Sequence, residues 1–257
     1  MDAFFTPDGD AFVATELTRG PWDEGSQHAG PPAALIGREL ERCEPREAAR
    51  IARVTFDILR PVPIARLRVE TRVVRPGRSV ELLEAVLRDD DGTDLVRATA
   101  WRIRIAPVGL DAPEDPAPPG PAEGRHEPFF PTGRDVGYHS AMEYRFVRGA
   151  FLEPGPATVW LRTRHPLVAG EEPSPLQRVL VAADSGNGVS AALDYREFVF
   201  INCDLTVHLS RHPAGEWVCL DAVTTPEPDG IGLADASLFD ERGRIGRATQ
   251  SLLVARR

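Results

Sequence analysis

Alternating hydrophobic and polar positions predict that most of this chain forms β-strands. The alternation is clear at 53–58 and 66–70, where it is typical of a strand with one buried face. The opening segment 4–16 is interrupted by Pro7-Asp8-Gly9-Asp10, which predicts a short strand, a turn and a second strand. Further strands are predicted at 51–59, 67–74, 80–88, 95–105, 143–147, 158–164, 198–209, 217–225, 232–239 and 245–254.

Two segments instead show the signals of α-helices. One covers 33–42, where Pro31 and Pro32 stand at positions that a first helical turn tolerates. The other runs from Ser174, a good N-cap, through Pro175 to about residue 186 and is apolar on nearly all sides. Because it has no polar face, we expect the second helix to be buried.

Asp184 lies near the end of this apolar helix. A buried carboxylate costs several kcal/mol unless a partner compensates, because desolvation disfavours the charged form. Asp184 is therefore expected either to be held by partners or to have a chemical function. The alternative is an exposed aspartate at a fraying helix end, next to Ser185-Gly186.

The order of elements repeats along the chain. Residues 106–131 contain eight prolines and little apolar periodicity, which predicts a linker. On either side, 54–60 matches 205–211 in pattern, and Arg97-Ala98-Thr99 matches Arg247-Ala248-Thr249, both at a shift of about 150 residues. The interpretation is two α+β domains, 1–105 and 132–257, each a long helix against an antiparallel sheet.

Composition narrows the class of protein. The chain has 257 residues, 42% of them hydrophobic, a net charge of -9, and arginine as its only basic residue besides histidine. An acidic chain without a basic patch disfavours nucleic-acid and anionic-membrane partners, and no apolar run approaches the roughly 18 residues of a membrane span. The N-terminus lacks the signals of a secretory leader. Three scattered cysteines, Cys43, Cys203 and Cys219, favour reduced thiols in the cytoplasm over disulfides. The histidines His126, His139 and His165 do not have the spacing of metal ligands, so no metal site is expected.

Several segments resemble those of a known family. Val181-Ala182-Ala183-Asp184-Ser185 is similar to the Leu-Ala-Asp-Ser helix segment of hotdog thioesterases, and 202–209 with Gly215-Glu216-Trp217 is similar to their following strand pair. With the repeated element order, the chain resembles the double-hotdog acyl-CoA thioesterases of type II over nearly its whole length. The resemblance implies a tandem hotdog fold, in which an antiparallel sheet wraps each long helix.

The same resemblance implies site residues. In the family an aspartate, a hydroxyl residue and a glutamine hold the attacking water, and these positions fall on Asp184, Asn202 and Gln250. Asn202 is a departure from the family pattern. His28-Ala29-Gly30 is similar to the His-Gly-Gly helix start of single-hotdog thioesterases, where the glycine N–H binds the developing oxyanion. One complete site per chain is expected, combining Gly30 with the three residues of the second half.

Each candidate residue also has a purely structural interpretation. Gln250 would be a solvated strand residue, and Asn202 would accompany an irregular strand position. His28 is expected as a loop or capping residue rather than a general base. Gly186-Asn187-Gly188 is expected to be a turn, and the four tryptophans are expected in the core or at interfaces.

Taken together, the predicted function is hydrolysis of acyl-CoA or related thioesters by water, without metal or cofactor, in a homodimer. The acyl tail would lie between helix and sheet, with the CoA nucleotide at the surface. A hotdog dehydratase or hydratase is a weaker alternative, because no histidine and carboxylate pair stands at a convincing spacing. A third possibility is a non-catalytic protein that binds acyl-CoA. Asn202, which departs from the family pattern, favours this possibility, whereas the presence of both Asp184 and Gln250 argues against it.

Overall fold

The computed structural model describes residues 2–111, 115–129 and 131–257. The helices are η1 (Glu16–Thr18), α1 (Gly30–Arg42), α2 (Tyr138–Ala141), α3 (Pro175–Ala183) and α4 (Gly186–Val189). The strands are β1 (Phe5–Asp8), β2 (Ala11–Ala14), β3 (Ala49–Ile58), β4 (Arg66–Arg75), β5 (Val80–Asp89), β6 (Asp94–Arg104), β7 (Met142–Ala150), β8 (Glu153–Thr163), β9 (Phe198–Asn202), β10 (Asp204–Leu209), β11 (Val218–Pro226), β12 (Ile231–Asp240) and β13 (Gly243–Arg256).

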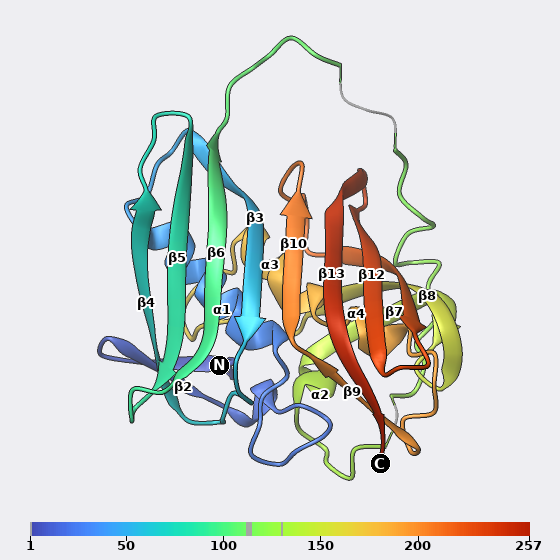
Figure 1. The fold of residues 1–257 in the computed structure, drawn as a ribbon. Helices are drawn as coiled ribbons and strands as arrows, with labels where there is room; N and C mark the ends of the chain where they lie inside the picture. Colours follow the sequence, from blue (N-terminus) through green and yellow to red (C-terminus); the bar gives the residue numbers. More distant parts are fainter. Residues whose placement is uncertain (1, 112–114, 130) are drawn as a thin grey trace.

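All these strands join one antiparallel sheet with two matching halves. The order is β1-β2-β4-β5-β6-β3-β10-β13-β12-β11-β8-β7, with β9 added beside β13 (Figure 1). At the centre Thr55 of β3 faces Thr206 of β10, and their hydroxyls lie 3.2 Å apart. Thr55 also faces Thr99 of β6, as Thr206 faces Thr249 of β13. The register therefore agrees with the match between 97–99 and 247–249 seen in the sequence.

The two long helices cover one face of this sheet (Figure 1). α1 packs against β3, β4 and β5, whereas α3 packs against β8 and β11, and the two helices contact each other. They run antiparallel, because Gly30 at the start of α1 lies against Val181 near the end of α3. A β-carbon at Gly30 would overlap the Val181 carbonyl oxygen, so glycine permits this close contact. Within the described residues, no helix has the length and apolar character to cross a membrane.

The sequence prediction for α3 is confirmed by its burial. Its apolar side chains lie in the main hydrophobic core, and Ser174 caps it by accepting a hydrogen bond from the Gln177 backbone N–H at 3.2 Å. Pro175 occupies the first helical position, where no N–H is required. The residue that follows the helix, Asp184, is therefore placed at the edge of the core.

Four details differ from the sequence prediction. The expected strand 198–209 is two strands, β9 and β10, because its pairing with β13 is interrupted at Cys203, after which β10 also pairs with β3. The expected turn at 186–188 is the short helix α4. Trp22 is 52% exposed, so the core, one of the two places expected for the tryptophans, is excluded for it.

The fourth difference concerns the expected linker. Its second part lies along the C-terminal half: the Trp160 indole N–H donates to the Pro119 carbonyl at 2.7 Å, and Arg125 and Phe146 exchange two backbone hydrogen bonds of 2.8 Å. Residues 112–114 and 130 of this segment lie outside the described residues. The described linker residues from 115 onward therefore belong partly to the packed structure.

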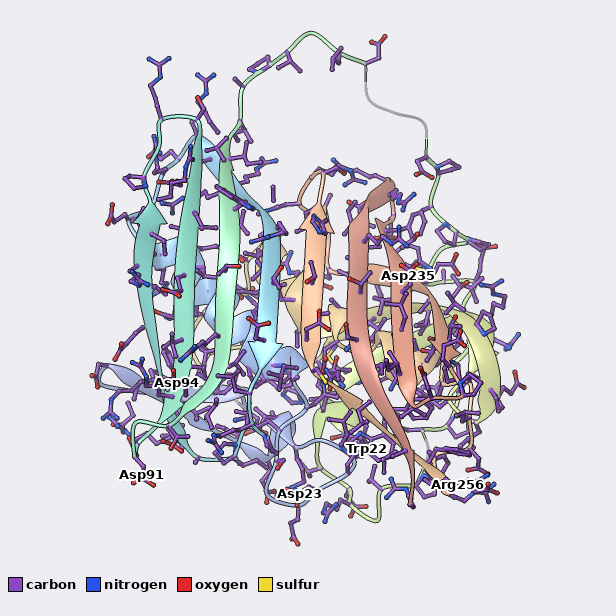
Figure 2. All side chains as sticks on the ribbon, in the orientation of Figure 1. Trp22, Asp23, Asp91, Asp94, Asp235 and Arg256 are labelled. Carbon is purple, nitrogen blue, oxygen red and sulfur yellow. The ribbon has the colours of Figure 1, made fainter. Side chains whose placement is uncertain are left out.

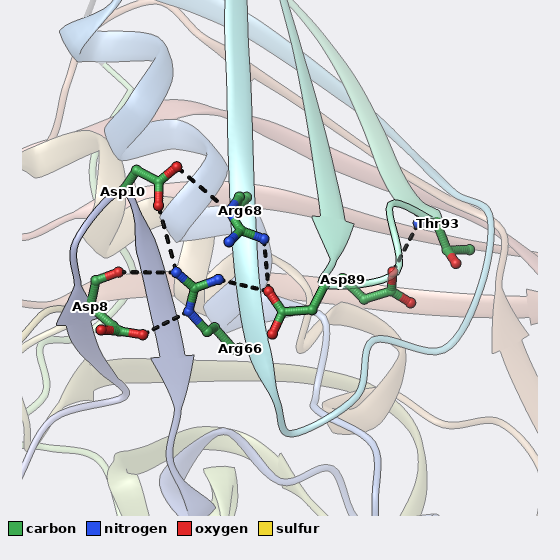
Figure 3. A network of polar contacts seen from close by, with 7 residues as sticks. Asp8, Asp10, Arg66, Arg68, Asp89 and Thr93 are labelled. Atoms are coloured by element: carbon green, nitrogen blue, oxygen red, sulfur yellow. Dashed lines mark hydrogen bonds and ion pairs between the residues drawn. The ribbon is translucent and has the colours of Figure 1, made fainter.

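An exposed charge network joins the first hairpin to the sheet (Figure 3). Arg66 of β4 donates to Asp8 at 2.6 Å and to Asp90 at 2.7 Å, and Arg68 also donates to Asp90 at 2.7 Å. The hydrogen bond from Arg66 holds the pKa of Asp90 below its usual range. These charges connect β1 and the turn after β5 to one strand.

Candidate active site

A cavity of about 440 Å³ opens where the two halves of the chain meet. Its walls come from the loop before α1, the end of α3, α4, β9 and the aromatic residues around β7. Figure 2 shows Trp22 and Asp23 on the loop before α1, at the same end of the molecule as Arg256. Residues from both halves therefore face one shared space.

Asp184 forms part of the cavity wall and is held from one side by two amides. Asp184 is only 7% exposed to solvent. The carboxylate oxygen Oδ1 accepts hydrogen bonds from Asn202 Nδ2 at 2.7 Å and from Gln250 Nε2 at 2.9 Å. Such bonds stabilise the charged form of a buried carboxylate. The alternative of an exposed aspartate at a fraying helix end is therefore wrong.

Gln250 and Asn202 are each fixed by their surroundings. Gln250 on β13 is 2% exposed, and its Oε1 accepts the Asn187 backbone N–H of α4 at 3.2 Å. Its amide nitrogen is thereby directed to Asp184, and the interpretation of a solvated strand residue is wrong. Asn202 is the last residue of β9, directly before the break at Cys203, so its irregular strand position is real. That position brings its amide to the carboxylate.

His28 contacts the other oxygen of the same carboxylate. Its Nδ1 lies 3.0 Å from Asp184 Oδ2, and the Gly30 backbone N–H lies 3.1 Å from the same nitrogen. The imidazole stacks on the Tyr138 ring with centroids 3.7 Å apart and planes 9° apart. Spacing along the sequence does not indicate a histidine and carboxylate pair, because the fold brings these two residues together from opposite halves of the chain.

Gly30 supplies an unusual helix start. It is the first residue of α1, and Pro31 and Pro32, which follow it, have no N–H. The next backbone donor, Ala33, already bonds the Ala29 carbonyl at 3.0 Å. Among the residues of this helix start, Gly30 is therefore the one whose N–H bonds outside the helix, to His28 Nδ1.

Tyr138 and Ser185 belong to this site and were not identified from the sequence. The Tyr138 hydroxyl donates to the Val181 carbonyl at 2.7 Å and lies 3.0 Å from the Ser185 hydroxyl. Burial raises the pKa of Tyr138, so it remains a protonated donor. Tyr138 lies in a short helix outside any alternating pattern, and no motif in the sequence distinguishes it.

Behind the carboxylate, a second polar cluster fixes α4. The Ser190 hydroxyl donates to the Gly186 carbonyl at 2.8 Å and lies 2.9 Å from the Thr224 hydroxyl. This cluster holds the Asn187 N–H against Gln250. Another part of the cavity wall is aromatic, with Phe129 and Phe151 packed edge to face at 4.5 Å. The cavity therefore combines a polar end with an apolar wall.

All five candidate residues from the sequence thus lie together: Asp184, Asn202, Gln250, His28 and Gly30. Across residues 2–111, 115–129 and 131–257, no group of three His, Cys, Asp or Glu side chains converges as a metal site would. The arrangement combines a buried carboxylate and a histidine in the cavity wall with the N–H at the start of α1, which donates to that histidine. Such groups can orient a nucleophile and stabilise a developing negative charge.

A family model described as the acyl-CoA thioesterase N-terminal domain matches residues 18–103, and one described as the acyl-CoA thioesterase C-terminal domain matches residues 111–254. No curated protein matches the chain significantly.

Solved structures match over almost the whole chain. A protein with a hot dog fold from Alicyclobacillus acidocaldarius has a TM-score of 0.75 and 16% identity, covering 98% of this chain and 95% of its own. An acyl-CoA thioesterase II from Mycobacterium marinum gives 0.69 and 15%, covering 97% and 94%. A tesB protein from Mycobacterium avium subspecies paratuberculosis gives 0.66 and 16%, covering 98% and 95%. These similarities show a shared hotdog fold.

Proposed function

The chain belongs to the acyl-CoA thioesterase family, and on this premise we propose that it hydrolyses acyl-CoA thioesters to a free acid and a thiol. The observation that supports this most directly is the buried Asp184 carboxylate in the cavity wall, held by the amides of Asn202 and Gln250 at 2.7 and 2.9 Å. The attacking water binds beside this carboxylate. Neither a metal nor a cofactor takes part.

The proposal includes a tandem hotdog arrangement. Residues 1–105 form one unit around α1 and residues 132–257 form the other around α3, joined by 106–131. The mirrored strand order on either side of the β3–β10 pair supports this division. The antiparallel contact between α1 and α3 then explains why a site combines the helix start of one unit with the carboxylate of the other.

The chemistry requires a positioned water and a donor for the thioester oxygen. Attack by water forms a tetrahedral intermediate whose oxygen becomes negative, and preorganised N–H groups stabilise that charge strongly in a site from which water is excluded. Gly30 N–H is the donor in this proposal. Asn202 replaces the expected hydroxyl residue by fixing the carboxylate through its amide. The acyl group lies against the aromatic wall formed with Phe129 and Phe151, and the CoA head group extends past Trp22.

The test is release of free thiol from acyl-CoAs of short, medium, long and aromatic type. Asp184→Asn keeps the size of the side chain but removes its charge, and we expect kcat/KM to fall at least about a hundredfold. Asp229→Asn, a change at an exposed residue that does not line the cavity, is the matched control and should retain the parent rate. Thiol must be measured after quenching, since the exposed Cys203 lines the cavity and would react with a thiol reagent.

Two outcomes would contradict the proposal. An Asp184→Asn protein that hydrolyses acyl-CoA at the parent rate would remove the carboxylate from the reaction. A parent protein that binds acyl-CoA but releases no thiol from any member of the panel would instead support the non-catalytic binding protein.

One observation favours a second candidate, hydration or dehydration of an acyl thioester. The 3.0 Å contact between His28 and Asp184 supplies the histidine and carboxylate pair that such a reaction needs. Crotonyl-CoA distinguishes the two reactions. Loss of its enoyl absorbance without release of thiol indicates hydration, whereas release of thiol indicates hydrolysis.

A further inference from the structure

The contacts of the His28 imidazole point to a role that the family resemblance does not give it. We infer that His28 is the catalytic residue that takes the proton from the attacking water, and that Asp184 is the positioning residue behind it. This inference rests on the proposed hydrolysis and assigns the proton transfer within the same site.

The first step of the argument is that one ring nitrogen has two contacts that exclude each other. His28 Nδ1 lies 3.1 Å from the Gly30 nitrogen and 3.0 Å from Asp184 Oδ2. An imidazole nitrogen either carries a proton and donates, or has a lone pair and accepts. It accepts from Gly30 only when unprotonated, and it donates to Asp184 only when protonated.

The second step decides between these states. Asp184 Oδ1 accepts two amide hydrogen bonds, from Asn202 and Gln250, and both favour the ionised carboxylate. An ionised Oδ2 at 3.0 Å from Nδ1 requires a proton on that nitrogen. In the reacting tautomer the Nδ1 proton faces Asp184, and the Gly30 N–H, which donates to Nδ1 in the structure, is released to bind the thioester oxygen.

The third step concerns the other ring nitrogen. With Nδ1 protonated, a neutral imidazole has its lone pair on Nε2. In the described part of the chain, Nε2 forms no hydrogen bond, yet it is not among the buried side-chain atoms that lack a partner. It is therefore accessible from the cavity that His28 lines. Stacking on Tyr138, whose hydroxyl is held by the Val181 carbonyl at 2.7 Å, fixes the plane of the ring.

The resulting reaction is balanced without any further reactant. The water oxygen bonds to the thioester carbon while a water proton passes to His28 Nε2, and the carbonyl oxygen takes up the negative charge against Gly30 N–H. The imidazolium is stabilised by the Asp184 carboxylate. When the tetrahedral intermediate collapses, the carbon–sulfur bond breaks and Nε2 returns its proton to the leaving thiolate. The products are one acid and one thiol.

The test compares His28→Ala with His165→Ala, a change at an exposed histidine whose ring contacts the Asp2 carbonyl at 3.3 Å. We expect kcat/KM for the best acyl-CoA to fall at least about a hundredfold in His28→Ala and to stay at the parent value in His165→Ala. Added imidazole should restore at least about tenfold of the lost rate in His28→Ala, because it replaces the missing base, and should leave Asp184→Asn unchanged.

Several results would overturn the inference. One is a His28→Ala protein within about fivefold of the parent, since loss of a general base costs far more. Another is a folded His28→Ala protein that imidazole does not rescue. Nitrogen-15 NMR of the parent protein gives a readout independent of the variant's folding: protonated Nδ1 with unprotonated Nε2 is expected, and the opposite tautomer contradicts it. A parent without turnover overturns hydrolysis and this inference together, whereas turnover that survives in His28→Ala overturns the inference alone.

Discussion

The contact between α1 and α3 can be tested at Gly30. An added β-carbon there would approach the Val181 carbonyl oxygen to less than 3.0 Å, a distance that real β-carbons essentially never show, and would lie 3.2 Å from His28 Nδ1. The Val181 oxygen cannot retreat, because it belongs to α3 and accepts the Tyr138 hydroxyl at 2.7 Å. Gly30→Ala therefore forces the start of α1 away from α3.

The size of the effect follows from the required movement. Restoring an ordinary contact of about 3.5 Å moves the helix start by roughly 1 Å. Overpacking of this kind costs about 1–3 kcal/mol, and each kcal/mol lowers the Tm of a protein of this size by about 2–4 °C. A shift of about 1 Å at a reacting group costs about a hundredfold in rate. For a mid-range cost of about 2 kcal/mol, we therefore expect a Tm about 4–8 °C lower and a roughly hundredfold lower kcat/KM.

Gly37→Ala is the matched control on the same helix face. Its added β-carbon meets the end of the Leu180 side chain, which can rotate away, rather than a backbone atom. Replacing glycine by alanine inside a helix also contributes up to about 1 kcal/mol of stability. Thermal melting and quenched thiol release should show a Tm within about 3 °C and kcat/KM within about threefold of the parent. Parent kinetics in Gly30→Ala, or equal losses in both variants, would refute the reasoning.

Three further changes test other parts of the structure. Asp240 is fully buried, which alone would raise its pKa, but Arg211 and two backbone N–H groups lower the pKa overall. The ionised Asp240 therefore stabilises the folded protein at pH values above 3.8, the pKa in the unfolded chain. This stabilisation is lost as the pH falls through the lower pKa of the folded protein. Asp240→Asn should lower the free energy of unfolding by about 3 kcal/mol at pH 7, the low end for a broken buried ion pair, because Arg211 is partly exposed. The difference in Tm between this variant and the parent should narrow between about pH 4 and pH 2. A difference that stays constant over this range would contradict the argument. Alkylation should modify the exposed Cys203, as mass spectrometry would detect, and should spare Cys219, whose thiol pKa is raised by burial. Because Cys203 lines the cavity, its alkylation should abolish activity, and bound acyl-CoA should slow this loss. Faster alkylation of Cys219 than of Cys203 would show that the cavity wall is wrongly assigned. Asp90→Asn removes an exposed ion-pair partner and should change the Tm by less than about 2 °C, with less effect at high salt; a larger drop would mean that the first hairpin depends on this network.

Much of the sheet was predictable because each strand shows its own alternation. The correspondence of 97–99 with 247–249 also appears in the register, since Thr99 and Thr249 face Thr55 and Thr206. The division of 198–209 was not predictable, because its apolar pattern continues through Cys203 while the pairing with β13 is interrupted there and β3 becomes a second partner. A periodic pattern indicates which face is buried but not which strand lies beside it.

The candidate site was predictable only in part for a similar reason. Asp184, Asn202 and Gln250 follow from a resemblance along the chain, whereas the contact of His28 with Asp184 depends on how two helices cross. That crossing is set by Gly30 and Gly37, whose missing side chains leave no hydrophobic signal. α4 was also missed, since a Gly-Asn-Gly segment has low helix propensity and is held by tertiary contacts such as the bond from Ser190 to the Gly186 carbonyl.

The antiparallel pair of α1 and α3 has two ends, and only one of them is proposed to form an active site. The residues at the second end explain this difference between two structurally similar ends. There the start of α3 meets the end of α1, as the start of α1 meets the end of α3 at Asp184. At this second end the Ser174 hydroxyl accepts the Gln177 N–H at 3.2 Å and donates to Glu41 at 2.6 Å.

The carboxylates at that second end already have hydrogen-bond partners. Arg38 donates to Glu171 through Nε at 2.7 Å, and Ser174 occupies Glu41. The serine cap already occupies one N–H of this helix start, and a carboxylate paired with arginine is a poor base. At the first end, the Gly30 N–H donates to His28 Nδ1, and it is His28, not an arginine, that contacts the Asp184 carboxylate. The same backbone contact therefore stabilises the fold at one end and leaves reactive groups facing a cavity at the other.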